Sequence, residues 1–332
     1  MNWIIAAPYL IDLKTGFWKE MGEGNELNFI CSPPEYIHSR SRKYTGMVEW
    51  LDYSLHTQKA WKMAQQYNAG IFTNFPQLAV LASLKKRVSR YSPPLIAGTF
   101  NLGGLPTGYK QRLSKSVLNN VDKFIVHSRH ECHAYSEYFS LPLERFEFIP
   151  LHRPVLPISF KEDIESPFIL AVGSAKRDYL TLINAVKRLN YNTVIVTPKK
   201  NLDGIKLPSN VSIKTDLSIS ECRQLVQKAC INIIPLNNKY TASGQVTVIE
   251  AMMLGKAIIA TNSIGTEDYL TKETGILIEE RNVESMCEAI SFLWENSVER
   301  KRLGDNAKSF ALNTFTEKQA AIKVSNMLNY FN

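Results

Sequence analysis

Short apolar runs alternate with amphipathic stretches along the first half of the chain. The runs have the length of buried strands, and the stretches between them have the spacing of helices that bury one face. This alternation predicts a parallel sheet covered by helices on both sides. We expect strands at residues 3–7, 28–31, 70–73, 95–98, 123–126 and 146–149, and helices at residues 47–66, 76–87, 109–119 and 131–139.

The second half repeats the alternation after a proline-rich stretch. Pro150, Pro154 and Pro157 form a stiff extended link, which the polar run 161–165 follows. Such a link is the expected boundary between two domains, because 332 residues exceed what one compact core usually holds. We expect strands at residues 168–172, 193–197, 211–214, 231–235 and 257–260, and helices at residues 218–228, 245–254, 298–313 and 317–330.

Composition narrows the class of protein. Hydrophobic residues make up 45% of the chain and charged residues 21%, as in soluble globular proteins. The apolar opening at residues 3–10 lacks a basic leader, so we expect a buried strand there and not a signal peptide. The five cysteines have no paired spacing, which predicts neither a zinc motif nor a disulfide framework and fits a cytoplasmic setting.

The net charge of +8 lies mostly in the first half, where 18 Lys/Arg face 12 Asp/Glu up to residue 158. A basic surface of this kind could meet an anionic membrane or a lipid-linked acceptor, although an ordinary solvated face explains each cluster equally well. No nucleic-acid-binding signature accompanies the charge, so we do not expect a nucleic-acid partner. The two basic clusters are Lys85, Lys86, Arg87 and Arg90, and Lys110, Arg112 and Lys115.

The stretch from Tyr240 to Asn262 carries the first candidate chemistry. Small and polar residues lead into a predicted helix, 245–254, which ends at Gly255. A loop that feeds a helix start presents backbone N–H groups and favours negative charge. Glu250 lies further along the helix, within reach of another group of the same ligand. We therefore predict an anion cradle at Ser243, Gly244, Gln245, Val246 and Thr247.

A second candidate anion site follows the strand at residues 168–172. This strand ends at Gly173 and Ser174, and the basic pair Lys176 and Arg177 precedes the next helix. Ligands of open α/β sheets bind at the carboxyl ends of strands, and a guanidinium can grip two phosphate oxygens at once. The alternative is a solvated basic pair with no ligand.

The run SGQVTVIEAMMLGKAIIAT at residues 243–261 resembles the nucleotide-binding segment of retaining glycosyltransferases of family 4, also called glycosyl transferases group 1. Glu250 matches the second of two family glutamates, which contacts the ribose, whereas Ala242 replaces the first, which contacts the donor sugar. Arg177 falls on the family's lysine. Ser174 falls on the family's arginine, and Lys176 is its possible substitute in binding the donor diphosphate.

The loop TFNLGG at residues 99–104 corresponds to a cleft-facing loop of this family. We expect Asn101, Gly103 and Gly104 to line the acceptor side, because they follow a predicted strand. His127 precedes a predicted helix cap and is a further candidate there, although a structural role is the first expectation. Trp50 and Trp61 are expected to pack between helices and not to stack on a sugar.

The resemblance implies the α/β fold called GT-B, with two Rossmann-like domains facing each other across a cleft. It implies an acceptor-binding domain at residues 1–158, a nucleotide-sugar-binding domain at residues 159–316 and a helix at residues 317–332 that returns to the first domain. The implied activity is metal-independent transfer of a hexose from a nucleoside-diphosphate sugar, with UDP favoured, to a hydroxyl of a glycan or glycolipid in cell-surface polysaccharide synthesis. No cofactor is expected, and the enzyme would be cytoplasmic, with a possible peripheral position on the plasma membrane.

Three alternatives to this activity remain from the sequence. A nucleotide-sugar epimerase of the same fold needs acid and base carboxylates, and Ala242 removes the most obvious one. A non-catalytic nucleotide-sugar-binding partner subunit is motivated by the losses at Ala242 and Ser174. A third possibility, a basic peripheral membrane scaffold, would bind lipid without binding a nucleotide. The absence of any Asp-x-Asp motif agrees with diphosphate binding without a metal.

Overall fold

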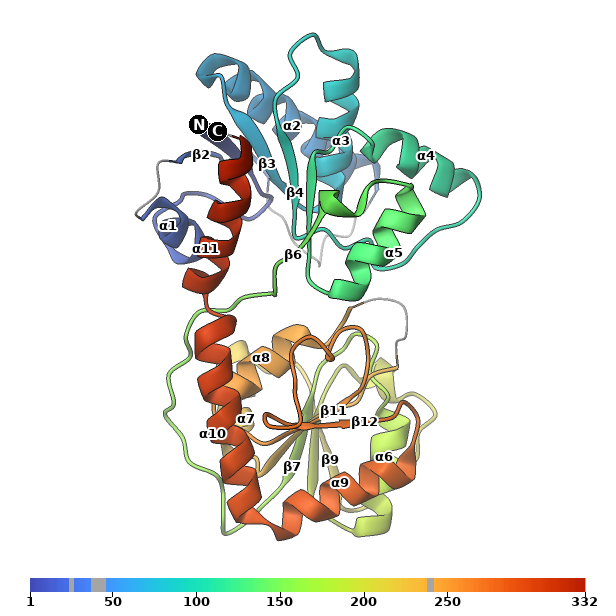
Figure 1. Cartoon of the computed structure of the whole chain (residues 1–332). Coiled ribbons are helices and arrows are strands. Elements are labelled where there is room, and N and C mark those ends of the chain that lie inside the picture. Colours follow the sequence, from blue (N-terminus) through green and yellow to red (C-terminus); the bar gives the residue numbers. More distant parts are fainter. Residues whose placement is uncertain (24–26, 37–45, 238–241, 332) are drawn as a thin grey trace. The chain divides into compact units, whose positions relative to one another are not determined.

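Two compact units divide the chain in the computed structural model, which describes residues 1–23, 27–36, 46–237 and 242–331. The first unit consists of Met1–Pro150 and Glu317–Asn332, and the second of Leu151–Thr316. Each unit is built on a six-stranded sheet in which every described strand pair is parallel (Figure 1). The predicted α/β fold with two Rossmann-like domains is therefore confirmed.

The first sheet has the strand order β2-β1-β3-β4-β5-β6. Its strands are β1 (Asn2–Ala6), β2 (Asn28–Ser32), β3 (Gly70–Asn74), β4 (Leu95–Gly98), β5 (Lys123–Val126) and β6 (Phe146–Phe148). The helices of this unit are α1 (Gly16–Gly22), α2 (Met47–Tyr67), α3 (Pro76–Val88), α4 (Tyr109–Leu118), α5 (Arg129–Phe139) and α11 (Glu317–Leu328), with short 3₁₀ turns at Leu143–Arg145 and Asn329–Phe331.

Alternate residues of the first sheet supply two separate cores. Ile4 and Ala6 of β1 pack under α2 and α3, whereas Trp3 and Ile5 point to the opposite face. Helices α1 and α11 cover that second face, where α1 contributes Trp18 and Met21. The sheet is thus buried on both sides, which explains why most positions of its strands are apolar.

Helix α11 closes the second core of the first unit although it lies at the end of the chain. Leu328 has no exposed surface, and Ala321 and Val324 are also buried against β1 and α1. Figure 1 shows this last helix, in red, beside α1. The fold prediction that the C-terminal helix returns to the first domain is thereby met.

The second sheet has the strand order β12-β11-β10-β7-β8-β9. Its strands are β7 (Ile169–Val172), β8 (Thr193–Val196), β9 (Val211–Lys214), β10 (Ile231–Ile234), β11 (Ile258–Thr261) and β12 (Ile276–Ile278). The helices of this unit are α6 (Tyr179–Leu189), α7 (Ile219–Lys228), α8 (Gln245–Met253), α9 (Val283–Glu295) and α10 (Ser297–Thr314), with a 3₁₀ turn at Lys199–Leu202.

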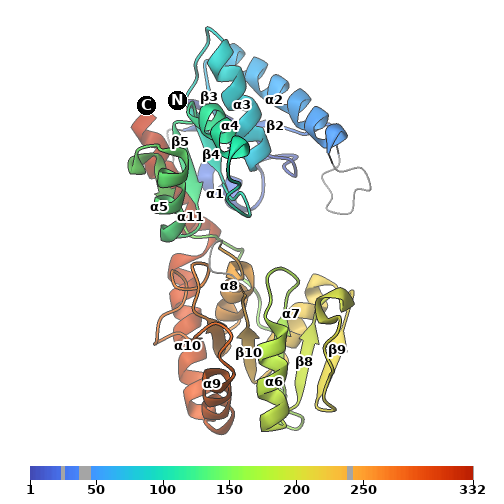
Figure 2. The ribbon, with the colours of Figure 1, turned by 90° about the vertical axis from the view of Figure 1, so that its right-hand side faces the viewer.

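Helices α6 and α9 share one core with the second sheet, and α7, α8 and α10 share the other. Figure 2, turned by 90° from Figure 1, brings α6 and α9 to the near side of this sheet. Ile169 and Ala171 of β7 face the first core, whereas Leu170 faces the second. Alternate side chains along β7 therefore face opposite cores, as they do along β1 in the first sheet.

Residues 151–158 belong to the second unit, although the predicted boundary placed them in the first. The N–H of Leu151 donates to the hydroxyl of Tyr269 at 2.9 Å, and Leu156 is buried in the core beneath α8. The boundary therefore falls directly after Pro150. Proline spacing located the connection, but the contacts that assign it to one unit are with residues far along the chain.

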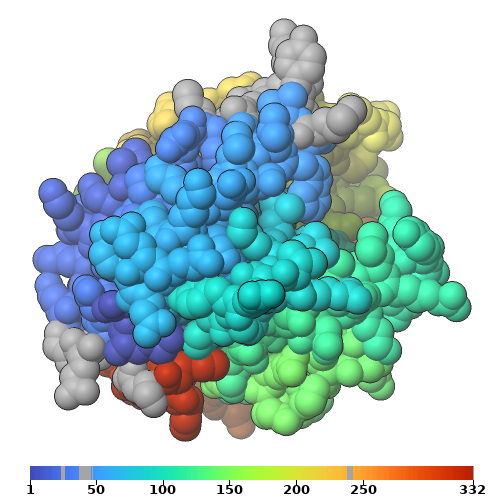
Figure 3. Space-filling view, turned by 90° about the horizontal axis from the view of Figure 1, so that it is seen from above, coloured from blue at the N-terminus to red at the C-terminus, as the bar shows by residue number. Residues whose placement is uncertain are grey.

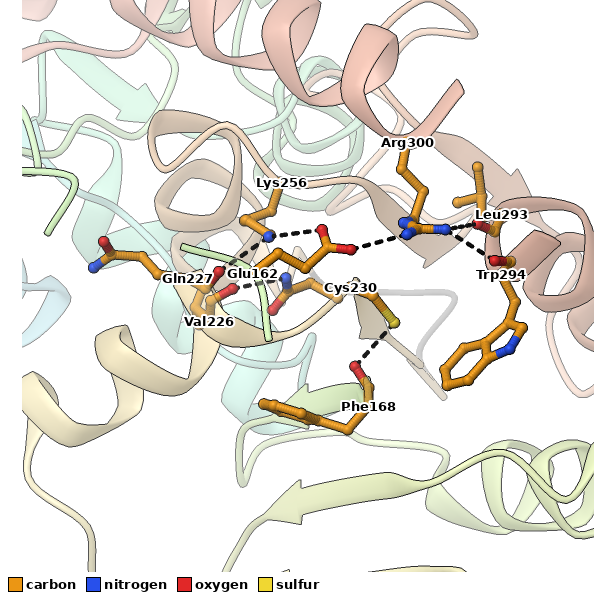
Figure 4. A network of polar contacts seen from close by, with 10 residues as sticks. Glu162, Phe168, Val226, Gln227, Cys230, Lys256, Leu293, Trp294 and Arg300 are labelled. Carbon is orange, nitrogen blue, oxygen red and sulfur yellow. Dashed lines mark hydrogen bonds and ion pairs between the residues drawn. The ribbon is translucent and has the colours of Figure 1, made fainter. Parts of the chain in front are cut away.

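The polar run 161–165 is anchored and not a free linker (Figure 4). One carboxylate oxygen of Glu162 accepts from Arg300 Nη2 at 2.9 Å and the other from Lys256 Nζ at 3.4 Å. The side-chain carbonyl of Gln227 accepts the N–H groups of residues 159 and 160 at 2.7 and 2.9 Å. Burial lowers the pKa of Lys256, and the neighbouring Glu162 opposes that effect.

One short helix was not predicted, and one tryptophan does not pack as expected. Helix α1 spans only 7 residues and had no predicted counterpart, because so short a segment shows little helical periodicity. Trp61 is 2% exposed and packs in the core as expected, but Trp50 is 44% exposed on the outer side of α2. The expectation that both tryptophans pack between helices is therefore wrong for Trp50.

We predict that Leu328→Ala destabilises the first unit by about 2–5 kcal/mol, because truncating a fully buried leucine removes apolar burial and leaves a cavity. The matched control is Ile322→Ala on the same helix, where the side chain is 47% exposed and the change should stay within about 0.5 kcal/mol. Urea unfolding followed by tryptophan fluorescence measures both. Equal effects of the two substitutions would contradict the packing of α11 described above.

Candidate functional site

The turn between β7 and α6 carries the predicted glycine and basic pair. Gly173 has a φ of +140°, which residues with side chains rarely adopt. The guanidinium of Arg177 lies across this glycine, so that a Cβ at Gly173 would be 2.3 Å from Arg177 Nη2. Ser174 and Lys176 are exposed beside it. Glycine thus makes room for a cation at the carboxyl end of β7.

Arg177 joins this turn to α8. Its Nη1 donates to the carbonyl oxygen of Ala175 at 2.8 Å, and its Nη2 donates to the hydroxyl of Thr247 at 3.1 Å. Burial lowers the pKa of Arg177, but arginine remains charged at neutral pH. The carbonyl of Lys176 accepts the N–H of Asn237 at 2.9 Å. The two segments that the sequence marked as anion sites therefore lie side by side.

Helix α8 starts at a backbone turn that only glycine fits well. Gly244 has a φ of +84°, and a Cβ there would lie 3.1 Å from the side chain of Ile234. Within the described ranges no side chain caps this helix start, and Ser243 Oγ is buried without a hydrogen-bond partner. Val246 is 43% exposed, whereas Gln245 is buried with its Nε2 donating to Tyr269 at 3.5 Å. An uncapped helix start is suited to an anion.

Tyr240 and Thr241, at the beginning of the stretch from Tyr240 to Asn262, lie outside the described residues. Ala242, which stands in place of the family's first glutamate, is 9% exposed. Its methyl group is therefore buried and offers no polar contact to a ligand.

The sequence reasoning missed Gly265. A Cβ at this position would lie 2.3 Å from the carbonyl oxygen of Ser243 and 2.4 Å from its nitrogen. The turn that contains Gly265 is fixed by Thr266, whose hydroxyl donates to the carbonyl of Thr261 at 2.6 Å. This turn therefore supports the backbone at the start of α8 by direct contact. A glycine after a short strand was the only sequence signal for it.

Asn201 was also missed. Its Nδ2 donates to the carbonyl of Ser174 and to the hydroxyl of Thr197, both at 2.8 Å. It thus ties the β7–α6 turn to the end of β8. A cavity of about 560 Å³ opens beside Arg177, and its polar lining includes Asn201, Asn237 and Arg281.

Glu250 lies on α8 one turn after Thr247, with a side chain that is 16% exposed. It forms ion pairs with Arg153 at 2.7 Å and Arg223 at 2.8 Å. Burial raises the pKa of this carboxyl, but the hydrogen bonds from Arg223 and Arg153 outweigh it and hold the pKa below its ordinary value. Glu250 is therefore ionised at neutral pH. Neither arginine was a sequence candidate.

The candidates of the first unit form a separate group. Asn101 donates to Glu131 Oε1 at 3.3 Å and accepts the N–H of Gly103 at 2.7 Å. A Cβ at Gly103 or Gly104 would meet nothing within 4 Å, so this loop is open. His127 is 7% exposed, and its Nδ1 hydrogen-bonds the carbonyl of Ile149 at 2.8 Å.

Burial lowers the pKa of His127, which favours the neutral imidazole. Its environment is that of a core histidine, as the first expectation had it. Across the described stretches of the chain, no group of three His, Cys, Asp or Glu residues could hold a metal ion.

Comparison with known proteins gives one match to a family model. Residues 166–296 match the family model described as glycosyl transferases group 1. The matched segment contains both Gly173–Arg177 and Ser243–Glu250. No curated protein matches the sequence.

Solved structures of the same architecture align over the whole chain. Anabaena Alr3699/HepE in complex with UDP has a TM-score of 0.72 at 13% identity, covering 99% of this chain and 100% of that chain. Sucrose-phosphate synthase (tll1590) from Thermosynechococcus elongatus has a TM-score of 0.71 at 15% identity, with coverages of 99% and 98%. The lipopolysaccharide outer core galactosyltransferase WaaB, in its apo form, has a TM-score of 0.70 at 10% identity, with both chains covered completely.

Identities this low establish the shared fold alone. The Anabaena protein has also been solved with UDP-glucose, which identifies the kind of ligand that this neighbour binds. The fold of the present chain is GT-B, and its residues 166–296 match the family model of the glycosyl transferases group 1.

Proposed function

We propose that the protein is a retaining glycosyltransferase of family 4. It would transfer a hexose from a nucleoside-diphosphate sugar, with UDP favoured, to a hydroxyl of a glycan or glycolipid acceptor in cell-surface polysaccharide synthesis. The observation that carries the proposal is the hydrogen bond from Arg177 to Thr247, which joins a cation to the uncapped start of α8 inside the matched domain. The UDP and UDP-glucose complexes of the Anabaena neighbour support the choice of donor.

Each candidate then has a role in the transfer. Arg177 and Lys176 would neutralise the diphosphate, together with the backbone of Gly173, Ser174 and the start of α8. Charge that develops on the leaving phosphate is stabilised by groups already in place. Glu250 would accept a hydrogen bond from the ribose and fix the donor's position.

The chemistry needs no side-chain base. The bond from the anomeric carbon to the phosphate oxygen breaks, and a bond to the acceptor oxygen forms on the same face of the sugar. The acceptor's hydroxyl proton passes to the departing phosphate oxygen. Cationic side chains take the role of a metal ion in this proposal, and no cofactor is required besides the donor and the acceptor. Asn101, Gly103 and Gly104 are proposed for the acceptor side, whereas the buried His127 would support the loop end of β5.

A second candidate is a nucleotide-sugar-binding partner subunit without turnover. The buried methyl group of Ala242, where the family has a carboxylate that contacts the sugar, favours it. Nucleotide binding without sugar transfer to any acceptor would support this candidate over the transferase.

We further propose a peripheral position at the cytoplasmic face of a membrane. No helix within the described ranges is long and apolar enough to cross a bilayer. On α4, Tyr109 and Leu113 are 78% and 51% exposed one helical turn apart, and Lys110 and Arg112 are exposed beside them. Figure 3 shows the teal-green segment that contains α4 on the surface of the first unit. Exposed apolar side chains flanked by cations suit an anionic lipid surface.

The first experiment is thermal unfolding against nucleoside diphosphates and their sugars, with and without a chelator. A ligand present at 100 times its dissociation constant stabilises the folded protein by about 2.7 kcal/mol. We expect a higher Tm with UDP and UDP-glucose, unchanged by chelator, followed by sugar release or transfer in a turnover assay. No shift with any nucleotide would refute the proposed function.

We predict that Arg177→Ala weakens UDP binding roughly tenfold to a hundredfold, because a charged hydrogen bond to phosphate contributes about 1.5–3 kcal/mol. Arg188→Ala is the control, since this arginine lies on the outer side of α6 with 60% of its side chain exposed. Titration calorimetry measures the affinity, and circular dichroism checks the fold. Unchanged affinity in Arg177→Ala would remove this residue from the site.

We predict that the protein sediments with anionic vesicles at low salt and is released at high salt, since screening weakens attraction between exposed charges. Lys110→Glu with Arg112→Glu should abolish sedimentation, whereas Lys206→Glu, an exposed lysine of the second unit, should not. Equal sedimentation with neutral and anionic vesicles would contradict the membrane proposal.

A further inference from the structure

Two arginines hold Glu250 from different parts of the second unit. Arg153 lies in the segment that opens this unit, and Arg223 lies on α7. The exposed fractions of the side chains are 31% for Arg153, 29% for Arg223 and 16% for Glu250. The three charges are therefore shielded from solvent in part, and the pairs are stronger than those of an exposed surface.

The hydrogen bonds fall unequally on the two carboxylate oxygens. Oε1 accepts from Arg153 Nε at 3.1 Å, from Arg153 Nη2 at 2.7 Å and from Arg223 Nη2 at 2.8 Å. Oε2 accepts from Arg223 Nε at 3.4 Å, its one bond among the described residues. A carboxylate offers about four acceptor directions, two on each oxygen. Oε1 is thus saturated, whereas Oε2 retains acceptor capacity.

Both arginines are themselves fixed. The N–H of Arg153 donates to the carbonyl of Phe315 at 2.9 Å, and Arg153 forms a β-bridge with Thr316. Helix α7, which carries Arg223, starts with a capping box formed by Ser218 and Glu221. The two guanidinium groups that hold the carboxylate are therefore carried by anchored backbone segments.

We propose that Arg153 and Arg223 are positioning residues that direct Oε2 of Glu250 to a single ribose hydroxyl of the donor nucleotide. The inference rests on the proposed function and adds how the ribose is recognised. Because Oε1 is occupied by the arginines, Glu250 receives one hydroxyl and not both hydroxyls of the vicinal pair. Fixing the carboxylate beforehand lowers the ordering cost that binding would otherwise incur.

The pair of arginines also sets the protonation state of Glu250. Burial raises the pKa of this carboxyl, and the bonds from Arg223 and Arg153 bring it below the ordinary value. Removing an arginine leaves burial less opposed, so the pKa rises and the carboxyl takes up a proton at mildly acidic pH. The other nearby groups are Cys222 on α7, whose pKa is raised by burial and by Glu221 and Glu250, and Arg177, which bonds Thr247 on α8.

The test is calorimetric binding of UDP-glucose between pH 5 and pH 8, because its pyrophosphate diester does not titrate in this range. The wild type should bind with constant affinity. Arg223→Ala and Arg153→Ala should bind progressively less tightly as the pH falls, by roughly tenfold from pH 8 to pH 5. Arg223→Lys should make the affinity for UDP-glucose nearly independent of pH again, since lysine returns the positive charge. His152→Gln, next to Arg153 in the chain, controls for histidine titration and should match the wild type.

UDP-glucose analogues that lack one ribose hydroxyl test whether Glu250 binds one hydroxyl and not both. Removing one of the 2′ and 3′ hydroxyls should weaken binding to the wild type about tenfold, and removing the other should change it little. Glu250→Ala should erase this difference.

The outcomes separate the two proposals. No binding of UDP-glucose by the wild type would refute the proposed function and this inference with it. Binding by the wild type combined with a pH-independent loss in the arginine variants would overturn only the positioning role. Equal losses with both deoxy analogues would overturn only the single-hydroxyl recognition.

Discussion

The guanidinium of Arg177, lying across Gly173 and bonded to Thr247, is the interaction on which the candidate site depends. Parallel strands bring their carboxyl ends to one edge of a sheet, so the turns after β7 and β10 meet there. Gly173 leaves room for the guanidinium of Arg177, and Gly244 leaves room for the side chains of Ile234 and Leu236 at the end of β10. The arginine is partly buried by this packing, which lowers its pKa while leaving it charged.

The candidate site differs from the family pattern at the positions of the two family glutamates. One family glutamate is replaced by Ala242, and the other, Glu250, is paired with Arg153 and Arg223. The site is therefore rich in positive charge, which favours an anionic diphosphate. An unpaired carboxylate would repel that diphosphate, whereas one neutralised by two arginines does not. Pairing thus makes the proposed ribose contact compatible with the proposed phosphate site on the same helix.

Local patterns predicted much of the fold and part of the site. Apolar runs located every described strand except β12 (Ile276–Ile278). A glycine followed by a basic pair located the turn at Gly173, and small and polar residues located the start of α8. Arg153, Arg223 and Gly265 could not be predicted in this way, because their roles depend on contacts with residues 97, 27 and 22 positions away. The predicted domain boundary differs from the observed one for the same reason. Residue 151 joins the second unit through its hydrogen bond to the side chain of Tyr269, far along the chain.

Helix α8 connects the site to the segment that enters the second unit. Its first turn meets Arg177, and its end leads through Gly255 to Lys256, which binds Glu162 of that segment. At the same end, α10 approaches so closely that a Cβ at Gly304 would lie 2.2 Å from the carbonyl oxygen of Gly255. Burying the ions Lys256, Glu162 and Arg300 costs desolvation free energy, so their pairing favours one arrangement more than it adds stability. The run from Ser243 to Lys256 therefore has two tasks, because one end forms the candidate anion site and the other holds the segment that enters the second unit.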